Sequence, residues 1–156
     1  GGYAVMPKLP RHAIDEGSDR ENAADFPAIG ISARSRQILM HSLDEAMNHP
    51  RGTAYSSRIS EPGRVAGGKT GTAQVRRITM MERESGVKKN KERPWRERDH
   101  SLFVGYAPVD KPKYAVSVVV EHSGGGSRTA APIARDVLKE VQRLYAPSQL
   151  ARRGVT

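Results

Sequence analysis

The sequence predicts an α+β fold in which a three-stranded antiparallel sheet is covered by helices. Two apolar segments separated by a short turn-forming sequence indicate an antiparallel hairpin. A third strand is expected upstream of this hairpin. Segments with helical spacing of apolar residues precede and follow the strands. The order helix, strand, hairpin, helix therefore favours one sheet layer packed against helices.

The first helix is expected over residues 32–49. Ser32 or Ser35 can cap its start, and Pro50 and Gly52 end it. Its apolar residues recur at helical spacing, which predicts one stripe facing a core. The stripe comprises Ile38, Leu39, Leu43, Ala46 and Met47.

Three strands follow this helix. The first is expected within residues 64–78, centred on 69–75, where small residues give way to β-branched ones. Residues 101–107 and the valine-rich segment 113–121 form the hairpin, and residues 108–112 (PVDKP) supply its turn.

The last helix is expected to start near Pro132, after a glycine-rich connection at residues 124–127, and to end before Pro147. Its apolar residues have helical spacing and predict a second core-facing stripe. This stripe comprises Ile133, Val137, Leu138, Val141 and Leu144.

The chain of 156 residues is basic, with 26 Lys and Arg against 17 Asp and Glu, a net charge of +9. Residues 76–99 hold nine basic and five acidic side chains with Trp95 as their only aromatic residue. Nucleic-acid surfaces gather cations and stacking aromatics on one face. We therefore expect a solvated, mobile insertion and no nucleic-acid partner. The absence of Cys excludes disulfides, thiolate metal sites and a cysteine nucleophile.

Residues 63–70 match the phosphate-loop pattern G-x-x-x-x-G-K-T. That loop needs a buried strand before it and a helix that starts at its Lys-Thr. Here the preceding residues 55–62 are polar, and Gly71 and Thr72 suit a strand better than a helix. A nucleotide-binding loop is therefore only a weak alternative.

The tetrapeptide Lys69-Thr70-Gly71-Thr72 offers a different chemistry on the same strand. A Lys-Thr-Gly strand is a signature of serine acyl-transferases. The ammonium group of Lys69 can attract a substrate carboxylate, and the threonine hydroxyls can donate hydrogen bonds to it. Gly71 carries no side chain, so a substrate can approach the strand closely.

Longer strings around this tetrapeptide resemble class B penicillin-binding proteins, and are most similar to the elongation-type penicillin-binding protein 2 transpeptidases. The resemblance covers roughly residues 32–145. It rests on the strings Gly67–Val75, His100–Pro108, Val118–His122, Gly124–Ser127 and Ala130–Ala134, and on Gly52-Thr53-Ala54.

This resemblance implies a peptidoglycan D,D-transpeptidase that works through a serine acyl-enzyme and is acylated by β-lactams. Lys69 would be the catalytic cation, and Lys69, Thr70, Gly71 and Thr72 would bind the substrate or drug. The backbone N–H of Thr72 would donate to the oxyanion. The family works without cofactor or metal on the periplasmic face of the inner membrane. Its expected partners are stem peptides, β-lactams and other cell-elongation proteins.

The chain departs from the family in two motifs. The only Ser-x-x-Lys is Ser85–Lys88, downstream of Lys69 and interrupted by Gly86, and no Ser-x-Asn occurs. We therefore expect residues 1–147 to be the C-terminal segment of a transpeptidase domain, with 148–156 a flexible tail. The serine and membrane anchor would lie outside this chain, which would be inactive alone and depend on the remainder of the domain. The alternative is a non-catalytic basic module that binds polyanions.

Overall fold

A computed structural model of the chain describes residues 3–4 and 26–145, so the predicted tail at 148–156 lies outside the described residues. The chain divides into two compact units, residues 1–39 and 40–156. In the first unit, Tyr3 and Ala28 form an isolated antiparallel bridge. The Ser32 hydroxyl accepts a hydrogen bond from the Ser35 backbone N–H at 3.0 Å, as expected for a residue that caps a helix.

The second unit contains the predicted antiparallel sheet. Its strands are β1 (Gly67–Ala73), β2 (His100–Ala107) and β3 (Tyr114–Val120), in the order β1-β2-β3. Thr70 pairs with Phe103, and Phe103 pairs with Val118. The prediction of an α+β fold is confirmed. Strand β1, which carries the Lys69–Thr72 tetrapeptide, lies at an edge of this sheet.

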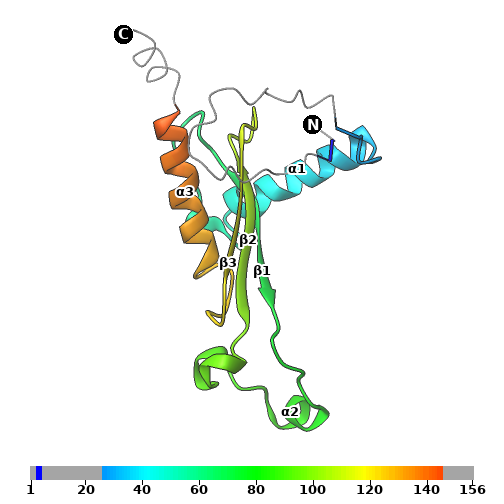
Figure 1. Cartoon of the computed structure of the whole chain (residues 1–156), viewed down its shortest axis with the longest axis vertical. Helices are drawn as coiled ribbons and strands as arrows, with labels where there is room; N and C mark the ends of the chain where they lie inside the picture. Colours follow the sequence, from blue (N-terminus) through cyan, green and yellow to red (C-terminus); the bar gives the residue numbers. More distant parts are fainter. Residues whose placement is uncertain (1–2, 5–25, 146–156) are drawn as a thin grey trace. The chain divides into compact units, whose positions relative to one another are not determined.

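Directly paired residues of neighbouring strands share a face of the sheet. The face with Phe103 and Val118 is covered by helix α3 (Ala130–Leu144), as Figure 1 shows beside β2 and β3. The buried side chains of Phe103 and Leu138 belong to the core between these layers. On the opposite face, the Tyr106 hydroxyl donates a hydrogen bond to the Met40 carbonyl in helix α1 (Ala33–Asn48).

The apolar stripe predicted for the first helix is only partly correct. Met47 is fully buried and Leu43 is half-buried, but Ile38 and Leu39 are 58% and 52% exposed. Helical spacing identifies one apolar face without showing how much of its length is covered. None of the helices in the described ranges is long and apolar enough to cross a lipid bilayer.

The stripe predicted for the last helix is also partly wrong. The fully buried apolar positions on α3 include Ala130, Ala134 and Leu138, whereas Ile133 and Val137 are exposed. Small residues four positions apart allow the helix to pack close to the sheet. The buried side of α3 therefore carries these small residues, and larger residues lie elsewhere on the helix. The larger residues then form an apolar stripe on the outer side of α3.

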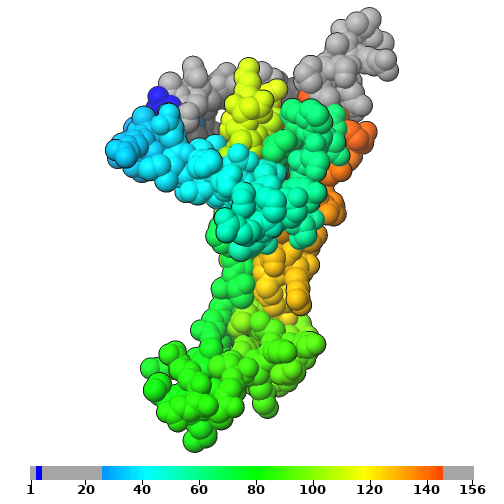
Figure 2. Space-filling model, turned by 180° about the vertical axis from the view of Figure 1, so that it is seen from behind, coloured from blue at the N-terminus to red at the C-terminus, as the bar shows by residue number. Residues whose placement is uncertain are grey.

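The charged insertion is exposed over most of its length but held by specific contacts. It contains helix α2 (Met80–Ser85) and the short 3-10 helices η3 (Asn90–Glu92) and η4 (Trp95–Glu97), at the lower end of Figures 1 and 2. Thr79 and Glu82 form a capping box at the start of α2. The buried side chain of Arg93 donates to the Lys88 carbonyl at 3.0 Å. Opposite charges within the segment also pair with each other, as Arg76 does with Glu82 and Arg93 with Asp99.

Candidate functional site

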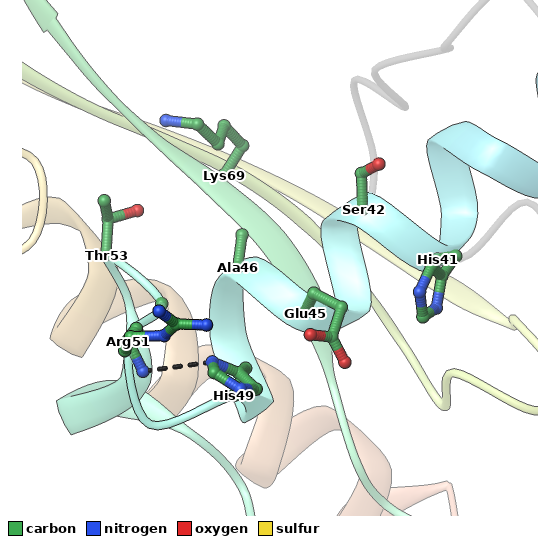
Figure 3. Close-up of a pocket in the computed structure, with 9 residues that line it drawn as sticks. His41, Ser42, Glu45, Ala46, His49, Arg51, Thr53 and Lys69 are labelled. Atoms are coloured by element: carbon green, nitrogen blue, oxygen red, sulfur yellow. Dashed lines mark hydrogen bonds between the residues drawn. The ribbon is translucent and has the colours of Figure 1, made fainter.

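Lys69 lies in the middle of β1 and helps to line an open concavity of about 590 Å³. Glu45 and Ser42 reach this concavity from α1, and Thr53 reaches it from the turn that follows α1 (Figure 3). The Lys69 ammonium group donates a hydrogen bond to the carbonyl oxygen of Thr70 at 2.7 Å. Its side chain is exposed and in no ion pair within the described residues, so its charge is available to an anionic ligand.

Thr70 and Thr72 point to one face of the sheet, and Lys69 points to the other, because side chains alternate along a strand. A ligand can reach all three only at an open edge. β1 provides this edge, since it pairs with β2 alone among the described strands. The long side chain of Lys69 also turns back to its own strand, as its bond to Thr70 shows. The site predicted from the sequence is therefore an edge site.

The structure adds Thr53 to these residues. The Thr70 hydroxyl donates a hydrogen bond to the Thr53 hydroxyl at 3.0 Å, which joins the turn after α1 to the edge strand. In the sequence, Gly52-Thr53-Ala54 contributes to the family resemblance, but no role could be given to Thr53 there. That resemblance was the only signal in the sequence that could have singled out Thr53.

The turn that carries Thr53 is fixed by the sequence around it. Gly52 donates its backbone N–H to the His49 carbonyl at 2.8 Å, and Ala54 donates to the Ala46 carbonyl at 3.0 Å. A Cβ atom at Gly52 would lie 2.5 Å from the Ala46 carbonyl oxygen, so the turn requires glycine. The Asn48 side-chain amide donates to the Ala66 carbonyl at 2.9 Å and ties α1 to the residue before β1.

Gly71 lies where another backbone segment approaches β1. A Cβ atom at Gly126, in the loop between β3 and α3, would clash with the carbonyl oxygens of Gly71 and Leu102. A Cβ atom at Gly71 itself would lie 3.2 Å from the Leu102 Cβ. Gly126 therefore allows the loop to rest directly on the edge strand.

The alternative motif readings do not fit this geometry. Lys69 and Thr70 lie inside a strand and not at the start of a helix, so residues 63–70 do not form a phosphate loop. Ser85 ends α2, and its hydroxyl donates to the Met81 carbonyl at 2.7 Å. Gly86 follows with a φ of 105°, so Ser85 and Lys88 do not share a helix turn. Within the described residues, no group of three His, Asp or Glu side chains could hold a metal ion.

Comparison with known proteins identifies the family. Residues 1–139 match the family model described as the penicillin binding protein transpeptidase domain. The peptidoglycan D,D-transpeptidase MrdA of Haemophilus influenzae is 42% identical over 96 residues, which cover 59% of this chain and 13% of that protein. The stage V sporulation protein D of Bacillus subtilis is 26% identical over 148 residues, which cover 90% of this chain and 20% of that protein.

Solved structures agree with these matches. The penicillin-binding protein PBP2 of Helicobacter pylori in complex with MreC has a TM-score of 0.58 and 28% identity, covering 74% of this chain and 19% of that chain. PBP2 of Pseudomonas aeruginosa in complex with WCK 5153 has a TM-score of 0.55 and 29% identity, covering 74% and 22%. The chain spans about an eighth of the length of the MrdA relative. It belongs to the penicillin-binding protein transpeptidase family, with relatives of the PBP2 kind.

Proposed function

We propose that the complete protein carrying this chain is a peptidoglycan D,D-transpeptidase. It forms an acyl-enzyme through a serine, releases D-alanine from the D-alanyl-D-alanine end of a stem peptide, and passes the acyl group to an amine on a neighbouring strand. The observation that carries this proposal is the Lys69–Thr72 tetrapeptide on the open edge of β1, in a chain of this family. The MrdA relatives bear the name of this activity.

Each residue of the tetrapeptide has a proposed task. The hydroxyls of Thr70 and Thr72 donate to the terminal carboxylate of the peptide or to the carboxylate of a β-lactam, and Lys69 supplies the positive charge. The backbone N–H of Thr72 donates a hydrogen bond to the oxyanion of the tetrahedral intermediate. Such a bond stabilises the negative charge strongly where the bound substrate excludes water. Gly71 keeps the strand clear of side chains where the substrate lies.

The nucleophile in this proposal comes from outside the 156 residues. The only Ser-x-x-Lys of the chain spans the end of α2 and the loop after it, in the charged insertion. The proposal therefore assigns the serine and the Ser-x-Asn motif to other parts of the complete protein. This chain supplies one wall of the active site and depends on the remainder of the domain for the rest.

The cellular location and the partners of the complete protein are inferred from its relatives. We propose that the complete protein works on the periplasmic side of the inner membrane, where peptidoglycan is cross-linked. Cell-elongation proteins are its proposed partners, because the similar PBP2 of H. pylori was solved in complex with MreC.

Covalent labelling by a fluorescent penicillin tests the proposed function. The complete protein should carry the label through a denaturing gel, and an excess of unlabelled penicillin should prevent labelling. The isolated 156-residue chain should remain unlabelled, because it lacks the serine motif. An unlabelled complete protein that is folded would overturn the proposed activity, and a labelled isolated chain would overturn the assignment of the serine.

A further inference from the structure

The charged insertion carries strongly exposed apolar side chains at helix α2. Met80 and Met81 are 70% and 77% exposed, the largest fractions among the large apolar side chains that the structure describes. Figure 1 shows α2 beyond the end of β1 and apart from α3. A concavity of about 570 Å³ on this part of the insertion is lined by Arg77, Ile78, Thr79, Met80 and Arg83. We call these five residues, none of which carries a carboxylate, the α2 groove.

The two cations of the α2 groove are not neutralised within the described residues. Arg76, which precedes the groove, pairs with the carboxylates of Glu82 and Glu97 and so engages them elsewhere. Neither Arg77 nor Arg83 takes part in an ion pair among the residues that the structure describes. A groove that combines apolar side chains with two such guanidinium groups attracts an apolar group that has carboxylates beside it.

The α2 groove is held in shape although it is exposed. The Glu82 backbone N–H donates a hydrogen bond to the Thr79 hydroxyl at 3.3 Å, and the Thr79 N–H donates to the Glu82 carboxylate at 3.1 Å. The Arg76 guanidinium donates to the same carboxylate at 2.9 Å. These bonds fix the first turn of α2 before any partner binds, which lowers the entropic cost of binding.

The composition of the α2 groove is typical of a protein interface. Met and Arg are enriched in such interfaces, and the rotatable bonds of Met let it adapt to the shape of a partner. A lipid surface would instead favour apolar side chains along one continuous face of a helix. Met80 and Met81 are adjacent in the helix, so their side chains point about 100° apart, and the concave groove between the arginines suits a protruding side chain better than a flat bilayer.

We propose that the α2 groove binds a segment of a partner protein that presents an apolar side chain flanked by Asp or Glu. The apolar side chain packs against Ile78 and Met80, and the flanking carboxylates pair with Arg77 and Arg83. This inference goes beyond the proposed transpeptidase function and does not depend on it, because no residue of the α2 groove belongs to the Lys69–Thr72 tetrapeptide.

The test compares the binding of two synthetic helical peptides to the complete protein. One peptide carries leucines along one face with glutamates beside them, and the other has glutamines in place of the glutamates. Fluorescence anisotropy of the labelled peptides measures the two affinities. We expect the glutamate peptide to bind about tenfold more tightly, because two exposed ion pairs each contribute modestly. The difference should shrink as salt is added.

Two double variants locate the binding. Met80→Ser/Arg83→Gln removes one apolar side chain and one cation from the α2 groove, and should weaken binding of the glutamate peptide about tenfold. Val87→Ser/Lys88→Gln removes an exposed apolar side chain and an exposed cation from the insertion outside the groove, and should leave the affinity unchanged. Circular dichroism checks that both variants are folded.

Three results would overturn the proposal. They are absence of peptide binding to the unaltered protein, equal affinity for the glutamate and glutamine peptides, and equal affinity of the two folded variants for the glutamate peptide. Each of them leaves penicillin labelling as a separate measurement, so a failure of this inference is distinct from a failure of the proposed transpeptidase function.

A bilayer is the other surface that the exposed methionines and arginines could meet. The chain contains no Cys, so a thiol-reactive fluorophore can be attached at Met81→Cys, and the protein without this substitution measures labelling elsewhere. The labelled complete protein is reconstituted in phosphatidylglycerol vesicles whose acyl chains carry bromine, which quenches fluorophores within the bilayer. We expect no quenching at residue 81, and quenching there would overturn the partner protein in favour of the lipid surface.

Discussion

Thr53 and Thr70 are 17 residues apart in sequence and share a hydrogen bond at the edge of the sheet. In the proposed mechanism, the Thr70 hydroxyl must donate its single hydrogen to a carboxylate. It can do so while still bonded to Thr53 if the Thr53 hydroxyl then acts as the donor, because a hydroxyl both donates and accepts. We therefore expect Thr53 to act as a positioning residue that orients the Thr70 hydroxyl in this mechanism.

Replacing Thr53 tests this role. Thr53→Val removes the hydroxyl at nearly constant volume, and we expect the rate of penicillin acylation of the complete protein to fall about fivefold, the equivalent of one hydrogen bond of about 1 kcal/mol. Thr53→Ser keeps the hydroxyl and should retain most of the rate. Equal rates for the valine and serine variants would contradict the positioning role.

The β3–α3 loop depends on glycine where it rests on β1. Gly126→Ala would place a Cβ atom against two backbone carbonyl oxygens, which cannot move aside as a side chain can. We expect a loss of about 2 kcal/mol in the free energy of unfolding, measured by urea denaturation. Gly125→Ala is the matched control, because a Cβ atom added there would meet no atom within 4 Å, and it should change stability by less than about 0.5 kcal/mol. Equal stability of the two variants would show that the loop does not press on β1.

The Glu82 carboxylate of helix α2 pairs with Arg76 at the start of the insertion, and its pKa is lowered. Hydrogen bonds from the Arg76 guanidinium, and next from the Thr79 backbone N–H, lower the pKa of Glu82 from 4.5 to about 2. Because the folded pKa lies below the unfolded value, the stabilisation is fully present above pH 4.5 and is lost as pH falls toward 2. An NMR titration of the Glu82 carboxyl should find its midpoint near 2. The Arg76→Gln variant should move the midpoint toward 4.5, and an unchanged midpoint would contradict this pairing.

The elements themselves could be predicted from the sequence, because each depends on local patterns. The helix predicted over 32–49 is observed as Ala33–Asn48, and the hairpin strands differ by only a residue or so from the observed ones. The buried side of α3 could not be predicted in the same way. Helical spacing identifies Ile133 and Val137 as apolar, but the close approach of helix and sheet places Ala130 and Ala134 inside.

Contacts between segments that are far apart in the sequence could not be predicted from it. Lys69 could be singled out because its chemistry belongs to a contiguous motif. The Thr53–Thr70 bond and the contact of Gly126 with Gly71 depend on how separate segments pack. The nine basic and five acidic side chains of the insertion allow many pairings, and only the fold selects Arg93 with Asp99.

At the scale of the whole molecule, the proposed function makes this chain one wall of a site whose chemistry requires further residues. The edge of β1 has no strand partner among the described residues, and the tetrapeptide lies on it. An unpaired edge offers backbone donors and acceptors to an extended ligand. A peptide or a β-lactam bound there would meet Lys69 and the threonine hydroxyls at once.

A crystal structure of the complete protein acylated by a β-lactam would test directly whether the edge of β1 binds the substrate. We expect the drug carboxylate to lie within hydrogen-bond distance, about 3 Å, of the Thr70 and Thr72 hydroxyls, with the acyl carbonyl oxygen facing the N–H of Thr72. A bound drug whose carboxylate contacts neither threonine, or whose acyl group lies away from the edge of β1, would contradict it.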